Sequence, residues 1–165
     1  QALLPFVHAM DAGIGDFAPG MHSAPLQLDE VALGTLICYE VIFPDLAQRQ
    51  VKKGAGILIN LSNDAWFGRS SGPVQHLHQA VLRSIEQNRY LLRATNTGIS
   101  AIITPHGRLL QIGRLNETCS INGPEITSIA QRTFFSRHFE LIRNSILLAA
   151  FILVGTGMIR SRRAG

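Results

Sequence analysis

The stretch GTLICYEVIFPDL, residues 34–46, decides how the rest of this sequence is interpreted. An apolar run ends in Cys38, a tyrosine and Glu40, and a turn marked by Pro44 follows. Most free cysteines are small buried hydrophobic residues without chemistry. A cysteine beside a carboxylate at the end of a strand can instead be a nucleophile. The surrounding chain has to decide between these two interpretations.

Three near-continuous apolar runs, rich in Val, Ile and Leu, predict strands over residues 31–39, 55–62 and 98–105. Runs of this kind are typical of strands that are buried on both faces of a layered α/β sheet. The dipeptide His106-Gly107 predicts a hairpin turn into a fourth strand over residues 108–113. We therefore expect an α/β fold with a largely buried sheet.

Two helices are expected between these strands. The segment 44–54 begins with Pro44 and ends with glycine, which suits a short helix. The segment 70–96 has Pro73 near the first helical position, and its apolar residues recur at helical spacing as far as Ile85. The predicted order is strand, helix, strand, helix, strand, strand. Residues 116–138 permit one or two short strands and a loop.

Composition excludes several classes of function. The 165 residues suffice for one domain with a core, and the formal net charge is +4. No basic stripe interleaved with aromatic residues is present, so we expect no nucleic-acid partner. Cys38 and Cys119 are too few for a disulfide scaffold, and His76 and His78 lie two apart, which places them on different helix faces. We expect no metal and no cofactor.

The C-terminal part of the sequence predicts a membrane helix. Residues 145–159 carry no charge, and a helix over residues 139–160 becomes long enough to span if Arg143 reaches the interface. Three arginines follow within residues 160–163, which places the tail 161–165 in the cytoplasm and residues 1–138 on the opposite side. The alternative is a buried core helix.

Polar residues follow two neighbouring predicted strands. In layered α/β folds the carboxyl ends of parallel strands surround a crevice. Cys38 lies at one such end and the segment SNDAWFG, residues 62–68, lies at the next, so both are expected at one pocket. Asp64 in this segment is expected to bond backbone amides in a turn, with general-base catalysis as the alternative.

These motifs together resemble the carbon–nitrogen hydrolase (nitrilase) superfamily, and within it the apolipoprotein N-acyltransferases. The resemblance rests on ICYE (37–40), NDAWFG (63–68) and the segment 83–110, with AGIGDFAPG (12–20) upstream. It implies part of a layered α-β-β-α domain followed by one transmembrane helix. It also implies a bacterial inner-membrane protein whose catalytic domain faces the periplasm.

The resemblance also implies site residues. The nucleophile of this family corresponds to Cys38, and the supporting residues that follow it correspond to Tyr39 and Glu40. Glu40 would lie on the same side as Cys38 if the strand continued that far, and its alternative role is a structural carboxylate. Trp66 and Phe67 are expected to line an apolar substrate pocket. The family's catalytic glutamate and lysine have no matching position, so we expect them upstream and expect this chain to be inactive alone.

The implied reaction transfers an acyl chain from a phospholipid to Cys38, and then to the amine of a diacylglyceryl-modified apolipoprotein. The protein is expected to act as a monomer. Two alternatives remain open. One is a nitrilase-type amidase that hydrolyses a small C–N bond, and the other is a membrane-anchored binding module that has lost its catalytic residues.

Overall fold

A six-stranded sheet forms the centre of the computed structural model, which describes residues 24–164 and the side chains of residues 24–156. The strands lie in chain order across the sheet. The three central strands are parallel, and the flanking pairs are antiparallel. The strands are β1 (Leu26–Leu28), β2 (Val31–Ile37), β3 (Ile57–Ser62), β4 (Leu91–Thr95), β5 (Ala101–Ile103) and β6 (Leu109–Ile112).

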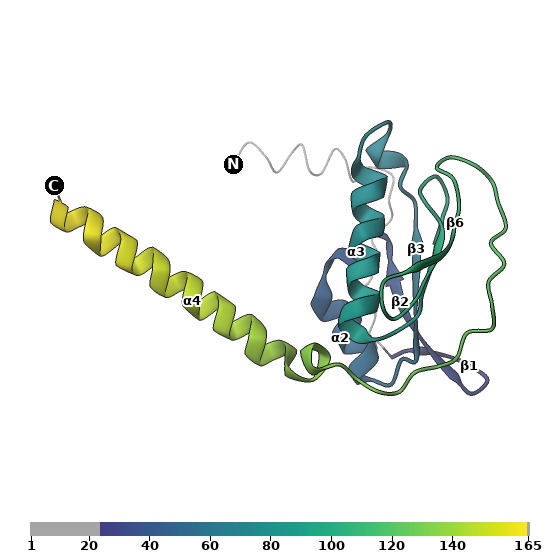
Figure 1. Ribbon diagram of the computed structural model, residues 1–165, viewed down its shortest axis with the longest axis horizontal. Coiled ribbons are helices and arrows are strands. Elements are labelled where there is room, and N and C mark those ends of the chain that lie inside the picture. Colours follow the sequence, from purple (N-terminus) through teal and green to yellow (C-terminus); the bar gives the residue numbers. More distant parts are fainter. Residues whose placement is uncertain (1–23, 165) are drawn as a thin grey trace, which may run out of the picture.

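Two helices, α2 (Pro44–Lys52) and α3 (Gly72–Gln87), cover one face of this sheet (Figure 1). They provide the crossovers between the parallel strands β2, β3 and β4, which need a connection of this length. Leu36 and Leu58 from the sheet pack against Leu77 of α3 in the same core cluster. Two short 3₁₀ helices, η1 (Cys38–Ile42) and η2 (Ala65–Phe67), follow the carboxyl ends of β2 and β3.

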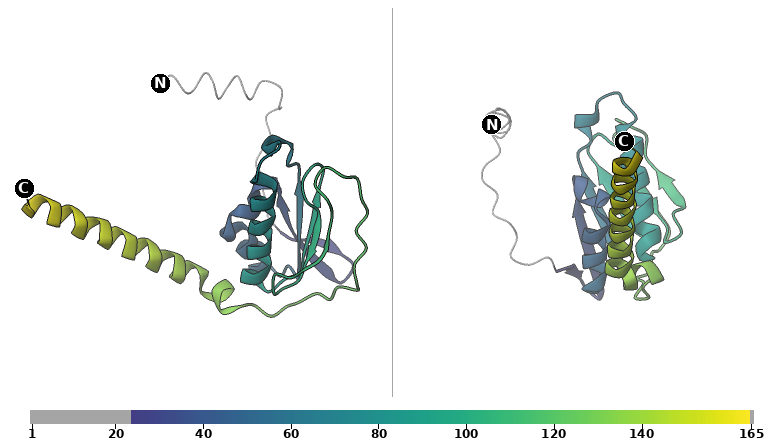
Figure 2. Two further views of the ribbon diagram at one scale, coloured as in Figure 1. Left: turned by 45° about the horizontal axis from the view of Figure 1, so that its top comes forward. Right: turned by 90° about the vertical axis from the view of Figure 1, so that its left-hand side faces the viewer.

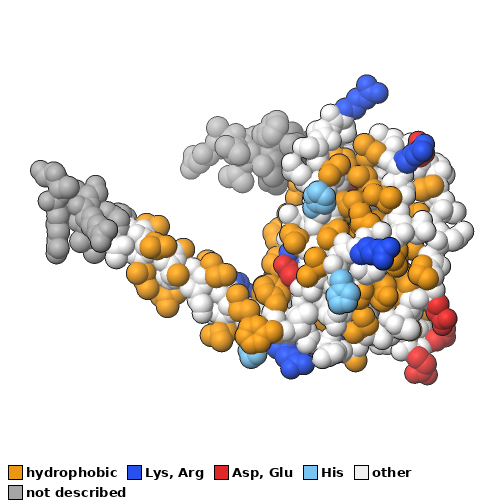
Figure 3. All heavy atoms as spheres, viewed as in Figure 1, with side chains coloured by type: hydrophobic (Ala, Val, Ile, Leu, Met, Phe, Trp, Pro, Cys, Tyr) orange, Lys and Arg blue, Asp and Glu red, His pale blue; other side chains and the backbone are white. Residues whose placement is uncertain are grey.

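The long helix α4 (Phe134–Ala164) extends away from the sheet (Figures 1 and 2). Its first turns pack on the domain, where Ser136 and Phe139 are buried and Gln48 donates a hydrogen bond to the Ser136 carbonyl. Residues Phe134–Thr156 are long and apolar enough to cross a membrane, and only 6% of the most apolar window is buried. Figure 3 shows hydrophobic side chains exposed along this helix. A buried core helix is therefore not what the structure shows.

A connector over residues 113–133, without helix or strand, links β6 to α4. Arg89 binds the end of this connector. The residue is 1% exposed, and its guanidinium donates to the carbonyls of Ala130 and Gln131, and also to those of Ala55 and two neighbouring residues. Burial, together with the smaller effect of the nearby charge of Arg132, lowers the pKa of Arg89 to about 10. Among the residues that the structure describes, the hydrogen-bond partners of this buried cation are thus carbonyl oxygens.

The predicted α/β class is confirmed, and three details of the prediction are wrong. The strand predicted over residues 31–39 ends at Ile37. Strand β1 was not predicted, and β4 was not separated from the preceding helical segment. Of the short strands and loop that residues 116–138 permit, the structure shows a loop over residues 116–133 and no strand. The motif AGIGDFAPG lies outside the described residues.

Candidate active site

Cys38 is the residue at which the chain leaves β2 and enters η1. Its φ angle is 49°, in the left-handed region that residues with a β-carbon seldom adopt. The parallel register pairs Ile37 with Leu61, so the next residues along both strands lie side by side. Accordingly the hydroxyl of Ser62 lies 3.4 Å from Sγ of Cys38. The thiol is half-buried and free.

Tyr39 and Glu40 occupy different surroundings. The Tyr39 ring is about half exposed and lies 6.1 Å from the Phe67 ring, measured between centroids. We expected Glu40 to lie on the same side as Cys38 if the strand continued that far. Strand β2 ends at Ile37, so this condition is not met. Its carboxylate instead accepts a hydrogen bond of 2.7 Å from the backbone N–H of Ile37. Glu40 thus closes the turn that contains Cys38.

Trp66 and Phe67 lie on η2, which follows β3. Together with Cys38, Tyr39 and Asn63 they line a cavity of about 380 Å³. The structure therefore brings the predicted nucleophile and both predicted apolar residues to one pocket. Trp66 is 81% exposed, so its indole forms an open edge of this pocket.

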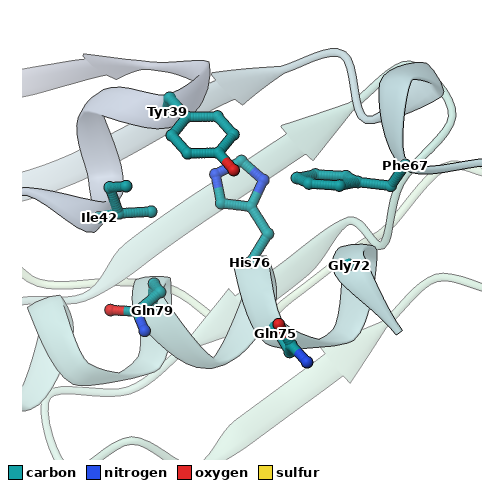
Figure 4. A pocket seen from close by; sticks show the side chains of 7 residues that line it. All are labelled: Tyr39, Ile42, Phe67, Gly72, Gln75, His76 and Gln79. Carbon is teal, nitrogen blue, oxygen red and sulfur yellow. The ribbon is translucent and has the colours of Figure 1, made fainter. Parts of the chain in front are cut away.

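A second cavity of about 320 Å³ adjoins the first and shares its Tyr39 and Phe67 side chains. Helix α3 provides its floor, including Gly72, Gln75 and His76. Figure 4 shows the imidazole of His76 beneath the Tyr39 ring, with Phe67 to one side. The centroid of the His76 ring lies 5.5 Å from that of Tyr39 and 5.7 Å from that of Phe67.

A buried polar network lies next to the turn that contains Cys38. The carboxylate of Asp64 accepts hydrogen bonds from Arg93 at 2.7 Å and from Ser62 at 2.7 Å, and it lies 2.9 Å from Nδ1 of His76. The side chains of Asp64 and Arg93 are fully buried. Burial lowers the pKa of Arg93, and the charge of Asp64 opposes that shift. A β-carbon at Gly98 would lie 2.2 Å from Asp64 Oδ2, so glycine is needed there.

Sequence reasoning missed most of this network. Asp64 was expected to bond backbone amides, whereas it bonds the side chains of three other residues. His76 and His78 do point to different faces, since His76 is buried and His78 is exposed. One signal was available: Arg93 is a charged residue within an apolar strand, and it pairs in register with Asn60. Among the described residues no cluster of three or more His, Cys, Asp or Glu side chains could hold a metal.

Comparison with known proteins gives a consistent result. The family described as carbon-nitrogen hydrolase matches residues 14–131. An apolipoprotein N-acyltransferase of Geobacter metallireducens is 38% identical over 158 residues, which cover 96% of this chain and 30% of that protein. One of Bdellovibrio bacteriovorus is 37% identical over 167 residues, with coverage of 98% and 30%. The chain thus spans about 30% of the length of these relatives.

The structural comparison supports the fold alone. The crystal structure of a carbon-nitrogen hydrolase from Helicobacter pylori aligns with a TM-score of 0.56 at 19% identity. The alignment covers 62% of this chain and 43% of that one.

Proposed function

The chain belongs to the carbon–nitrogen hydrolase family, and from that premise we propose that it acts in the N-acylation of bacterial lipoproteins with Cys38 as the acyl carrier. The names of the two relatives described above support the choice of reaction within the family. The structural observation that carries the proposal is the position of Cys38. Its thiol stands at the carboxyl end of a central parallel strand and opens into an apolar pocket.

In the first half of the proposed reaction, the thiolate of Cys38 attacks the ester carbonyl of a phospholipid. The bond from the carbonyl carbon to the glycerol oxygen breaks, and a lysophospholipid leaves with a proton. The backbone N–H of Tyr39 is the donor we assign to the oxyanion of the tetrahedral intermediate, where one such donor contributes about 3 kcal/mol. The product of this half-reaction is a thioester at Cys38.

In the second half, the α-amine of a diacylglyceryl-modified apolipoprotein attacks this thioester. The C–S bond breaks, an amide forms and the thiol is restored. Water would compete with the amine, so a pocket that excludes water favours transfer over hydrolysis. Trp66 and Phe67 are the apolar side chains we assign to this task, because they line the cavity that holds Cys38.

Thiol activation requires additional groups. A cysteine of ordinary pKa near 8.5 is mostly protonated at neutral pH, so it needs a neighbouring base or cation. We assign these roles to parts of the relatives' length that this chain does not match, and we expect the chain to be inactive alone. Glu40 acts by closing the turn around the nucleophile, through its bond to Ile37.

The proposal places the protein in the bacterial inner membrane. Helix α4 crosses it over residues 139–160, and residues 1–138 contribute to a catalytic domain on the periplasmic side. The basic tail 161–165 stays in the cytoplasm. The protein acts as a monomer, with a phospholipid donor and a lipoprotein acceptor as its partners.

An activity assay on the complete gene product in detergent tests the proposal. Phosphatidylethanolamine and a diacylglyceryl-cysteine lipopeptide are supplied, and the N-acylated lipopeptide is quantified by mass spectrometry. Cys38→Ser is expected to abolish the product, and the matched change Cys119→Ser is expected to leave it intact, because Cys119 lies on the connector. Hydrolysis of small amides without lipopeptide acylation would instead establish the amidase alternative.

A further inference from the structure

We propose that His76 is a positioning residue: its Nε2–H holds the carbonyl oxygen of Cys38 and thereby keeps the nucleophile in its left-handed conformation. This inference rests on the proposed function, since it treats Cys38 as the nucleophile. It concerns the backbone of Cys38 rather than the protonation of its thiol.

The backbone of Cys38 needs such support. At a φ of 49° the β-carbon crowds the following carbonyl group, which disfavours this conformation for any residue except glycine. A residue remains in a disfavoured region only where the surrounding structure determines its position. The chain could otherwise relax toward an extended conformation, and the direction of the thiol would change with it.

Two side-chain donors converge on the carbonyl oxygen of Cys38. Nε2 of His76 lies 3.2 Å from this oxygen, and Nδ2 of Asn60 lies 3.3 Å from it. The same Asn60 nitrogen donates to the carbonyl of Leu36 at 2.9 Å. A carbonyl oxygen is only an acceptor, so Nε2 of His76 carries a proton. The carbonyl oxygen of Cys38 is thus bound by one side chain from α3 and one from β3. Both elements are distant from the turn in the sequence.

His76 is itself held firmly. Only 3% of it is exposed, and its Nδ1 lies 2.9 Å from Asp64 Oδ1 and 3.1 Å from Arg93 Nη2. The rings of Tyr39 and Phe67 pack on the imidazole from the pocket side (Figure 4). The imidazole therefore has little freedom to rotate, and a rigid donor can hold a strained backbone.

Cysteine, histidine and aspartate also form the catalytic triads of other enzymes, in which the imidazole takes the proton of the nucleophile. The geometry here differs from that arrangement. Nε2 of His76 is directed to the carbonyl oxygen of Cys38, while the polar partner of Sγ in the described part of the chain is the Ser62 hydroxyl. His76 is accordingly assigned a positioning role and not that of a general base.

Amide variants of His76 in the complete gene product test the inference. In His76→Gln the side-chain NH₂ can reach the place of Nε2, whereas in His76→Asn it reaches only the place of Nδ1. The readouts are kcat and KM for acyl transfer from phosphatidylethanolamine to a diacylglyceryl-cysteine lipopeptide, and the pH profile of Cys38 alkylation by iodoacetamide, followed at that peptide by mass spectrometry. The same two changes at the exposed His78 are the matched control.

We expect His76→Asn to lower kcat about 100-fold, because a misplaced nucleophile costs rate rather than substrate binding. KM and the midpoint of the alkylation pH profile should stay near the wild-type values. His76→Gln should retain kcat within about tenfold of wild type. Both His78 variants should match wild type.

Equal kcat values for the Gln and Asn variants, or a shifted pH midpoint in His76→Asn, would overturn the inference. If His76→Asn does not fold, His76→Phe replaces it, because this variant keeps the ring packing and lacks the donor. An unacylated wild-type Cys38 would contradict the proposed function instead, and the alkylation rates would then still decide whether His76 positions the thiol.

Discussion

At Cys38 the backbone turns from an extended strand into a left-handed conformation, and this turn determines which neighbours the thiol has. A strand that continued to Tyr39 would have placed Glu40 beside the thiol. The observed turn sends the Glu40 carboxylate back to the N–H of Ile37 and leaves Ser62 as the polar neighbour of Sγ. The φ angle of Cys38 therefore decides whether Glu40 lies beside the thiol or bonds the backbone of its own turn.

The buried pair of Asp64 and Arg93 carries a prediction at the same scale. Asp64→Asn keeps the shape of the side chain but leaves the guanidinium of Arg93 buried without its counter-ion. We expect the free energy of unfolding to fall by about 3–5 kcal/mol, as is typical when one partner of a buried pair is removed. Pulse proteolysis in urea, applied to the complete gene product in detergent, measures this change.

The matched control is Glu117→Gln, which breaks an exposed pair with Arg114 at 3.7 Å. Its effect should stay within about 0.5 kcal/mol, because exposed ion pairs contribute little. Similar losses for the two variants would show that the Asp64 network does not support the fold.

At the scale of elements, α3 and β4 show what the sequence could predict. The helix is recognisable because Pro73 lies near its start and an apolar stripe runs as far as Ile85. The strand that follows, β4, lies in the middle of the sheet, and its sequence LLRAT has no regular alternation of apolar and polar residues. Asn88, with a φ of 53°, is the residue that ends the helix, and only tertiary pairing with β3 reveals the strand after it.

Arg89, two residues before the start of β4, gives a prediction about the connector. Arg89→Met removes a donor that serves five carbonyl oxygens, two of them on residues 130 and 131. We expect a loss of about 3 kcal/mol in the free energy of unfolding, and faster proteolysis within residues 113–133. Arg89→Lys should give an intermediate loss, because an ammonium keeps the charge with fewer donors.

This loss should not vary with pH between 5 and 9. The folded-state pKa of Arg89, about 10, lies below the ordinary value of an arginine. Stability linked to this group is therefore fully present only above the unfolded-state pKa, is lost as the pH falls through 10, and is constant below that. The free energies of unfolding of wild type and Arg89→Met, measured at pH 6 and at pH 8, check this expectation. A large difference between the losses at the two pH values would show that other titrating groups are coupled to the hydrogen bonds of Arg89.

Helix α4 carries the prediction about membrane topology. Fluorescent protein fused after Gly165 in the complete gene product should fluoresce, and alkaline phosphatase at the same position should be inactive, because the arginines of residues 160–163 stay in the cytoplasm. Phosphatase inserted after Gly123 of the connector should be active. Active phosphatase at Gly165 would contradict the proposed orientation.

For the whole molecule, the sheet has two different faces. Helices α2 and α3 seal one face over the core cluster. On the other side, Ile59 and Ile102 line a cavity of about 400 Å³ with Ile121 of the connector. The turn at Cys38 lies between the carboxyl ends of the strands and helix α3, and the side chains of Asn60 and His76 contact its backbone.

The class of this fold and the position of Cys38 could be predicted because apolar runs and turn residues are local signals. The network of Asp64, His76 and Arg93 could not be predicted. Asp64 lies between β3 and η2, His76 lies on α3 and Arg93 on β4, and they meet only once the parallel register of β3 and β4 is known. The strands and the position of Cys38 thus follow from local sequence signals, whereas the polar network around Cys38 follows from the tertiary fold.

The intact mass of the complete gene product tests the central claim most directly. After incubation with phosphatidylethanolamine in detergent, wild type should gain the mass of one acyl chain, and hydroxylamine should remove it, as expected for a thioester. Cys38→Ala should gain nothing. A folded wild-type protein without an adduct, or an adduct that persists in Cys38→Ala, would contradict acyl transfer through Cys38.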